Sequence, residues 1–216
     1  MRYFSILILS MLLNAAAWAE GQLSALPAPA VDAPLAVKPT RQTAVFAGGC
    51  FWGVELVFQH VKGVVSATSG YAGGTANTAR YDAVSRGSTG HAEAVQVVYD
   101  PSKVSYGQLL KIFFAVAHDP TQLDRQGPDT GPQYRSAIFT MDAEQQRIAQ
   151  AYIRQLEAAR VYPNKIVTRL GTLPAFYPAE DYHQDFATRH PLHPYIYYHD
   201  RPKLERLKQQ YPEWYE

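Results

Sequence analysis

The stretch TAVFAGGCFWGVELVFQHV, residues 43–61, carries the clearest structural pattern of the chain. Its first part is a short apolar run that ends in paired glycines, which predicts a buried strand. Apolar side chains then recur at helical spacing until Gly63, which predicts a helix that stops at this glycine. Cys50 lies where the two patterns meet. The sequence therefore predicts that Cys50 occupies a strand-to-helix turn.

Outward from this turn, strand and helix patterns alternate along the chain. The predicted order is β-α-β-β-α-β-α-β. This order indicates an α+β fold, a ferredoxin-like two-layer plait in which helices cover one face of a mainly antiparallel sheet. The region after Gly171, rich in aromatic residues and proline, is predicted to be a long coil that ends in a short basic helix at 201–210. The other predicted strands are 64–74, 94–101, 134–142 and 165–170, and the other predicted helices are 104–120 and 143–160.

The composition is that of one globular domain, predicted to span 41–216. Of the 216 residues, 47% are hydrophobic and 18% are charged, which is enough apolar material for a buried core. The formal net charge is +1. A balance so close to zero does not indicate nucleic acid or anionic lipid as a partner.

A separate N-terminal region precedes this domain. Residues 1–19 have a basic start at Arg2, an apolar run and a small-residue exit before Glu20, which is the pattern of a Sec-type signal peptide. The apolar run is shorter than the ~20 residues that cross a bilayer comfortably, so an uncleaved anchor is the less favoured alternative. Residues 20–40 are rich in alanine and proline and are predicted to be a disordered tether. The protein is therefore expected to be exported, to the periplasm of a bacterium.

Cys50 is the one cysteine of the chain. Exported proteins usually pair their cysteines, because oxidising compartments let disulfides persist. A lone cysteine is either a small buried hydrophobic residue or a reactive thiol, and export favours the second alternative. The two glycines before it and the helix after it supply flexible backbone and free N–H groups that favour a thiolate. This placement suits a nucleophile.

Residues near this motif allow two interpretations each. Phe51 and Trp52 are either core aromatics or an apolar clamp for a substrate methyl group. Glu93 is either an outward charge on a strand or an acid that donates a proton. Asp129 suits a turn as well as a polar site. Glu55, on another face of the helix from the cysteine, is expected to serve structure.

Five segments, in order, carry a more specific signal. They are GGCFWGVE, SGYAGG, TGHAEAVQVVYDP, HDPTQLDRQGPDTGPQYRSAIF and FYPAEDYHQ. This series resembles the motifs of the A-type peptide methionine sulfoxide reductases. The resemblance spans 45–184, and PYI and PKLERL, within 194–207, resemble the tail of that family. A series of this length is far more specific than GCFWG alone.

The resemblance implies an activity and a set of site residues. The implied activity is reduction of the S epimer of methionine sulfoxide, free or in peptides, without metal, flavin or nucleotide. The implied nucleophile is Cys50, and the implied proton donor is Glu93. Phe51 and Trp52 are implied to form the methyl pocket. The implied supporting polar groups are Tyr81, Tyr134 and Asp129.

The chemistry of sulfoxide reduction requires such a set. A sulfoxide oxygen leaves poorly until a proton reaches it, and a carboxyl group kept protonated by an apolar wall can supply that proton. Attack by Cys50 then leaves the cysteine as a sulfenic acid. Many members of the family resolve this species with a second cysteine, where this chain has Ile196. The expected reductant is therefore an outside thiol, such as a thioredoxin-like domain or a small thiol.

Two other function classes stay open at this point. A cysteine hydrolase would use His91 or His183 as a base and would turn over esters without a reductant. A binding module would recognise sulfoxide or methyl groups without turnover. A metal site is not predicted, because the histidines of the C-terminal region match neither HExxH nor a paired-finger spacing. These histidines are His183, His190, His193 and His199.

Overall fold

The computed structural model describes residues 26–216. The predicted signal peptide, 1–19, and the first residues of the predicted tether lie outside the described residues. Within 26–216, no helix is both long enough and apolar enough to cross a membrane.

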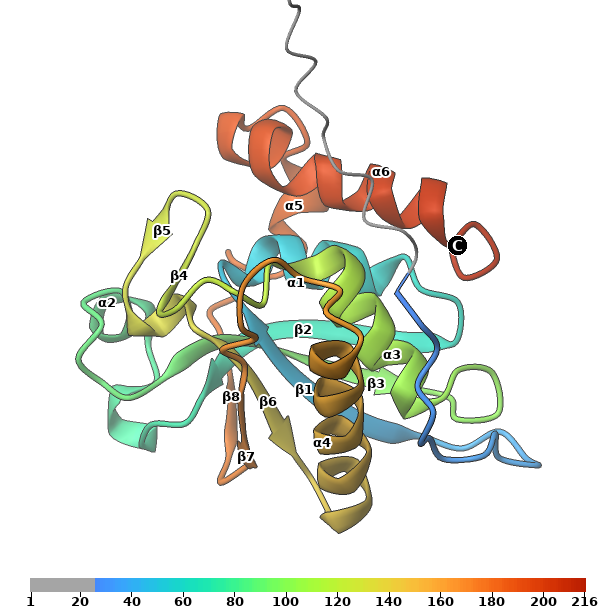
Figure 1. Cartoon of the computed structure of the whole chain (residues 1–216). Helices are drawn as coiled ribbons and strands as arrows, with labels where there is room; N and C mark the ends of the chain where they lie inside the picture. The colour runs from blue at the N-terminus through green and yellow to red at the C-terminus, as the bar shows by residue number, and fades with distance from the viewer. Residues whose placement is uncertain (1–25) are drawn as a thin grey trace, which may run out of the picture.

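A six-stranded sheet forms the centre of the molecule (Figure 1). The strands, including two of a separate hairpin, are β1 (Gln42–Gly48), β2 (Val64–Ala72), β3 (Ala92–Tyr99), β4 (Arg125–Gln126), β5 (Asp129–Thr130), β6 (Ser136–Thr140), β7 (Arg169–Thr172) and β8 (Phe176–Pro178). The order in the sheet is β7-β6-β1-β3-β2-β8, and β4 pairs with β5 in the hairpin. Neighbouring strands are antiparallel except β6 and β7, which run parallel. The chain is thus an α+β protein with a mixed, mainly antiparallel sheet.

Helices accompany this sheet. Those of the described residues are α1 (Phe51–Gln59), α2 (Tyr81–Val84), α3 (Tyr106–Ile112), α4 (Ala143–Ala158), α5 (Phe186–Arg189) and α6 (Arg201–Gln210). Capping side chains define where α3 and α4 begin. Ser105 Oγ accepts a hydrogen bond from Gln108 N at 3.1 Å, and Gln108 Oε1 accepts one from Ser105 N at 2.8 Å. Asp142 accepts one from Gln145 N at 2.8 Å at the start of α4.

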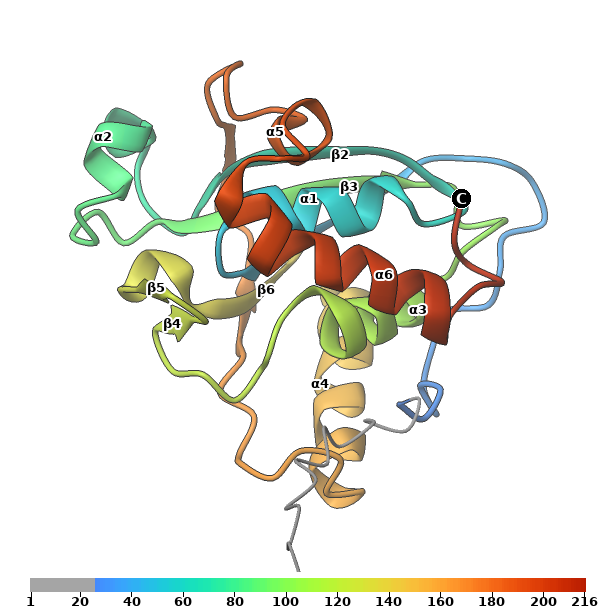
Figure 2. The ribbon, with the colours of Figure 1, turned by 90° about the horizontal axis from the view of Figure 1, so that it is seen from above.

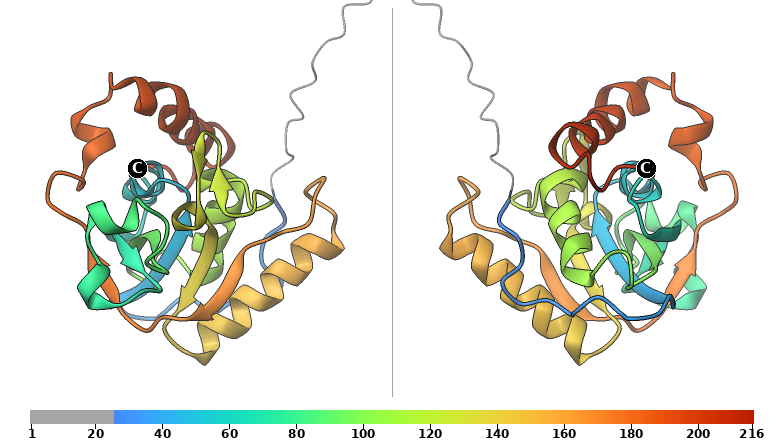
Figure 3. Two further views of the ribbon diagram at one scale, coloured as in Figure 1. Left: turned by 90° about the vertical axis from the view of Figure 1, so that its left-hand side faces the viewer. Right: turned by 90° about the vertical axis from the view of Figure 1, so that its right-hand side faces the viewer.

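The two faces of the sheet are covered differently. On one face, α1, α3 and α4 pack over large strand side chains such as Phe46 and Ile138 (Figures 1 and 3). The ring of Phe46 stacks on those of Phe58 and Phe113, with centroids 5.2 and 4.9 Å away. The other face carries smaller residues, mostly alanines, against which Phe176 packs. Because successive strand residues point to opposite faces, the large side chains meet the helices on one face and the small ones meet Leu173 and Phe176 on the other.

Residues 26–40 pack against the domain, so the prediction of a disordered tether does not hold for them. The carbonyl of Pro27 accepts a hydrogen bond from the Tyr152 hydroxyl at 2.9 Å. The carboxylate of Asp32 accepts one from Gly107 N at 2.8 Å, in the first turn of α3. Composition does not show such long-range anchors. A few of them suffice here because the prolines already restrict the unfolded chain.

The region after Gly171 is more regular than the predicted coil. β8 pairs with β2, and residues 196–200 form one π-helical turn that leads directly into α6. α6 lies alongside α1 (Figure 2). Pro202 fits at the start of this helix, where a missing N–H costs no internal hydrogen bond. Apolar side chains of the region, Ile196 and Leu207 among them, are buried against the domain and order it.

Candidate active site

Cys50 occupies the turn between β1 and α1, as predicted, and immediately precedes the first residue of α1. Gly49 has a φ of +93°, and a Cβ there would come within 2.5 Å of the Gln126 side chain, so this position requires glycine. Cys50 itself is 9% exposed. The turn therefore presents a nearly buried thiol at the N-terminus of a helix.

The surroundings of this thiol oppose its ionisation. Burial raises the pKa of Cys50 well above its ordinary value, and the carboxylates of Glu93 and Asp200 raise it further. A hydrogen bond from the backbone N–H of Trp52 acts in the opposite direction. The thiol is therefore protonated at neutral pH, and a proton must leave it before the sulfur can attack.

Glu93 lies on β3 beside this turn. It is 2% exposed, and its Oε2 accepts a hydrogen bond from Phe51 N at 3.1 Å. Burial raises the pKa of Glu93 to about 8, although the hydrogen bond from Phe51 lowers it. Glu93 is therefore largely protonated at neutral pH and can donate a proton. The alternative of an outward strand charge does not hold.

Two tyrosines and an aspartate reach the same place from separate elements. Tyr81 begins α2, Asp129 lies in β5, and Tyr134 ends a short 3-10 turn that follows the hairpin. Burial raises the pKa of Tyr134, and the charges of Glu93 and Asp129 raise it further. Burial also raises the pKa of Tyr81, and the charges of Glu93 and Cys50 raise it further. Both hydroxyls stay protonated and lie within electrostatic range of the thiol and its acid.

Phe51 and Trp52 have different surroundings. Phe51 is 1% exposed and belongs to the core. Trp52 is half-buried, stacks on Phe186 with ring centroids 3.9 Å apart, and donates from Nε1 to His183 Nδ1 at 3.2 Å. The ring of Tyr195 meets it edge-on, with centroids 5.9 Å apart. Of the two aromatics, the indole of Trp52 is the one with apolar surface left for a ligand.

The FYPAEDYHQ segment holds several of these groups in place. The carboxylate of Glu180 accepts hydrogen bonds from Tyr81 N at 2.9 Å and from the Tyr71 hydroxyl at 2.8 Å, which ties α2 to β2. The side-chain amide of Gln184 accepts from Ser69 N at 3.0 Å and donates to Ser69 O at 2.9 Å. The segment thus positions Tyr81, a role that its sequence alone did not disclose.

Two residues of the C-terminal region border the site without having been predicted there. The Tyr195 hydroxyl donates a hydrogen bond to the Asp129 carboxylate. Asp200 is 0% exposed and acts electrostatically on Cys50. Tyr195 belongs to the PYI triplet, so the sequence carried a signal for it. No motif or periodicity marked Asp200.

Glu55 is a second buried carboxyl group, and its partners lie elsewhere. It accepts hydrogen bonds from Ser69 Oγ at 3.1 Å and from Asp185 N at 3.2 Å. Burial raises the pKa of Glu55 to about 7. These contacts join α1 to β2 and to the residue before α5, in agreement with the expected structural role.

The histidines that a hydrolase would use are engaged in other contacts. His91 Nδ1 accepts a hydrogen bond from Gly74 N at 3.2 Å, and its Nε2 lies 3.0 Å from Thr75 O. His183 Nδ1 accepts from the indole of Trp52. Among residues 26–216, no group of three or more His, Cys, Asp or Glu side chains is arranged to hold a metal ion.

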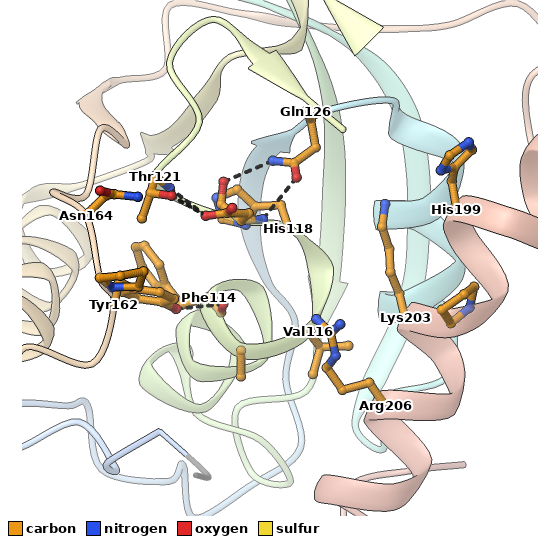
Figure 4. A pocket seen from close by; sticks show the side chains of 14 residues that line it. Phe114, Val116, His118, Thr121, Gln126, Tyr162, Asn164, His199, Lys203 and Arg206 are labelled. Atoms are coloured by element: carbon orange, nitrogen blue, oxygen red, sulfur yellow. Dashed lines mark hydrogen bonds between the residues drawn. The ribbon is translucent and has the colours of Figure 1, made fainter. Parts of the chain in front are cut away.

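A cavity of about 580 Å³ lies next to the site (Figure 4). Lys203 and Arg206 of α6 line one side, and Tyr162 lies on the opposite side. Cys50 is not among the lining residues. Gln126, whose side chain packs on the Gly49 backbone, lines the cavity as well. The cavity is therefore a neighbour of the catalytic turn and not the space into which the thiol points.

Comparison with known proteins agrees with this arrangement. Residues 42–215 match a family model described as peptide methionine sulfoxide reductase. The chain is 59% identical over 177 residues to peptide methionine sulfoxide reductase MsrA 2 of Mesorhizobium japonicum. The matched region covers 82% of this chain and 91% of that protein. It is 56% identical over 188 residues to the protein of the same name from Synechocystis, with coverage of 86% and 88%.

Two solved structures are also similar. Mxr1 from Saccharomyces cerevisiae in its reduced form has a TM-score of 0.63 and 32% identity, over 71% of this chain and 87% of that chain. Methionine sulfoxide reductase A of Corynebacterium diphtheriae has a TM-score of 0.63 and 36% identity, over 79% and 85%. The chain therefore belongs to the peptide methionine sulfoxide reductase family, and it is an oxidoreductase.

Proposed function

We propose that Cys50 reduces methionine sulfoxide, free or within peptides, by direct attack on its sulfur. The observation that carries this proposal is a buried, protonated carboxyl group beside the thiol. Glu93 keeps its proton up to about pH 8 and is held by the N–H of the residue after Cys50. A sulfoxide oxygen needs such a proton before its bond to sulfur can break.

In this step oxygen moves from the substrate to the enzyme. Cys50 gives up its proton and its sulfur forms a bond to the sulfoxide sulfur, while Glu93 delivers a proton to the oxygen. The oxygen then bonds to the Cys50 sulfur as the substrate S–O bond and the new S–S bond both break, and methionine leaves. The thiol proton replaces the one that Glu93 has lost, so the carboxyl group ends the step unchanged. Methionine sulfoxide loses its oxygen and gains two electrons. Cys50 gains that oxygen as a sulfenic acid and loses two electrons.

The walls of the site suggest how the substrate lies. The substrate methyl group packs on the half-buried indole of Trp52, and the oxygen accepts hydrogen bonds from the hydroxyls of Tyr81 and Tyr134. The sulfoxide sulfur is pyramidal and carries three different groups. When the methyl group and the oxygen each have an assigned wall, only one epimer exposes its sulfur to Cys50. We propose the S epimer, in line with the family resemblance.

Regeneration of Cys50 requires a thiol from another molecule, because the chain has no second cysteine. Ile196 stands where many members of the family have a second cysteine. Its side chain is 2% exposed and packed with Leu56 and Ala187. An outside thiolate attacks the sulfenic acid, water leaves, and a mixed disulfide forms. A second thiol then releases Cys50. The proposed reductant is a thioredoxin-like domain or a small thiol.

The wider setting of the enzyme follows from its sequence and topology. The pattern of residues 1–19 supports export and repair of oxidised proteins in the periplasm. For the fold, we propose the ferredoxin-like plait. The order β6-β1-β3-β2, joined as strand-helix-strand-strand-helix-strand, supports that assignment.

The activity is tested by counting the methionine that each enzyme molecule forms without a thiol. With excess sulfoxide, the wild-type protein is expected to release about one methionine per Cys50 and then stop, because one nucleophile is consumed per cycle. Dithiothreitol should restore multiple turnovers, and Cys50→Ser should release none. Continued turnover in thiol-free buffer contradicts the mechanism. Ester hydrolysis without a reductant would indicate a hydrolase instead.

A further inference from the structure

α6 meets the first turn of the catalytic helix through one buried ion pair. Asp200 is 0% exposed, and Lys203 Nζ donates a hydrogen bond to its Oδ1 at 3.1 Å. Both groups lie against Gly53 of α1, where a Cβ would come within 2.0 Å of Asp200 Oδ1 and 2.6 Å of Lys203 Nζ. The absence of a side chain at Gly53 therefore lets α6 place two opposite charges beside the helix turn that follows Cys50.

The two members of the pair differ in their access to other groups. The side chain of Lys203 is 15% exposed and lines the cavity, where Figure 4 shows it extending along the wall near His199. Asp200 Oδ2 is buried and has no hydrogen-bond partner among the described residues. A buried carboxylate with only one of its oxygens bonded exerts a strong field on its neighbours, because little solvent screens it.

Cys50 is one of these neighbours. Carboxyl groups act on the thiol from three elements: Glu93 on β3, Asp129 on β5 and Asp200 before α6. Glu93, whose pKa is about 8, is ionised in the higher pH range where the thiol titrates, and it acts on the thiol more strongly than Asp200 does. Asp200 differs from the other two because Lys203 is in direct contact with it. Burial raises the pKa of Asp200, and the charges of Lys203 and His199 act against that rise. The neutral hydroxyl groups around the thiol are those of Tyr81, Tyr134 and Tyr195.

We infer that Asp200 and Lys203 are a positioning pair that sets how readily Cys50 becomes a thiolate. The inference deepens the proposed function and rests on the role of Cys50 as nucleophile. A lone carboxylate in this place would hold the thiol proton more tightly, and a lone ammonium group would help to release it. Held together, the two charges oppose each other, and their contact also fixes α6 against α1.

The test is the pH dependence of the reaction of iodoacetamide with Cys50, followed by mass spectrometry in the full-length mature protein. Cys50 is the one thiol, so the label reports on it alone. Asp200→Asn leaves the Lys203 ammonium group unopposed, and the midpoint of the pH profile should fall by about one pH unit. Lys203→Met leaves the Asp200 carboxylate unopposed, and the midpoint should rise by a similar amount. Lys203→Arg keeps the charge and should restore the wild-type midpoint.

Matched variants on the exposed side of α6 control for the change of net charge. Glu205→Gln and Lys208→Met remove the same charges away from the site, and neither should move the midpoint. Circular dichroism confirms that each variant is folded. If Asp200→Asn does not fold, the rise of the midpoint expected for Lys203→Met, and the unchanged midpoint expected for Lys203→Arg, decide the question. Equal midpoints in all folded variants, or shifts of the same sign for Asp200→Asn and Lys203→Met, overturn the inference.

This test is independent of the reductase activity because alkylation needs no sulfoxide. Opposite shifts in a protein that releases no methionine would keep the positioning pair and refute the proposed reaction. Unshifted midpoints in an active reductase would refute the pair and keep the reaction. The thiolate ultraviolet absorbance, measured against Cys50→Ser, gives the same midpoint without depending on access of the alkylating reagent.

Discussion

Two regions build the surroundings of Cys50 in different ways: the turn at residues 48–52, which contains it, and the C-terminal segment at 180–203, which packs beside it. The turn consists of Gly48 at the end of β1, then Gly49 and Cys50, and the first two residues of α1, all adjacent in sequence. The C-terminal segment reaches the site through residues far away in the chain. Tyr195 binds Asp129, and Lys203 and Asp200 lie against the turn's own helix.

This difference separates where the nucleophile sits from how it behaves. Local backbone geometry places the thiol at a helix N-terminus. Its acidity and its contacts with substrate depend on groups that tertiary packing brings close. Loss of a chemical group supplied by packing should therefore reduce activity while the turn itself stays folded. Glu93→Gln and Tyr195→Phe test this expectation. Glu55→Gln, at a buried carboxyl group whose partners lie elsewhere, is the contrasting case and should change stability instead.

Glu93→Gln should remove most of the reductase activity, by about a thousandfold in kcat, because an amide cannot deliver the proton. Methionine release in the presence of dithiothreitol measures the effect. Glu55→Gln is the matched control, since it changes the other buried carboxyl group near α1 in the same way. Circular dichroism should show both variants folded. If Glu55→Gln lost the activity and Glu93→Gln kept it, the assignment of the two carboxyl groups would be reversed.

Glu55→Gln should instead change how stability depends on pH. The pKa of Glu55 is about 7 in the folded protein against an ordinary value of 4.5, so the folded state keeps a proton that the unfolded state has lost. The free energy of unfolding therefore falls as pH rises from 4.5 to about 7, by about 3 kcal/mol at most. Urea unfolding below and above this window measures the fall. A wild-type pH dependence in the variant would show that Glu55 does not join α1 to the C-terminal segment as described.

Tyr195→Phe should have the smallest effect, because it removes one hydroxyl group and keeps the ring against Trp52. Loss of a hydrogen bond to a charged group costs about 2 kcal/mol, so kcat/KM should fall on the order of tenfold or more. Tyr198→Phe, at an exposed position of the same segment, is the control and should leave kcat/KM unchanged. If kcat/KM were equal in the two variants, the Tyr195 hydroxyl group would have no part in the site.

Much of the fold was predictable because its signals are local. The strand and helix around Cys50, the strands at 64–74, 94–101 and 134–142 and the long helix α4 each show their own periodicity, and the structure contains all of them. The last strand was placed too early, because β7 covers Arg169–Thr172 and overlaps the predicted 165–170 only at its end. The segment 26–40 and the region after Gly171 were predicted as irregular, and both are ordered. They are held by contacts over long sequence separations, such as Tyr152 with Pro27 and β8 with β2, and no local pattern encodes such contacts.

From the sequence one could predict the nucleophile, through the resemblance to the reductase family, and its place at a helix N-terminus. The single cysteine of the chain, together with that role, predicts the need for an outside thiol. Three other properties became visible in the folded chain: Glu93 holds a proton at neutral pH, Trp52 is half-buried while Phe51 is fully buried, and Asp200 and Lys203 lie beside the catalytic helix. The physical reason is that a pKa and an exposed surface depend on which atoms surround a group, and most of those atoms come from distant parts of the chain.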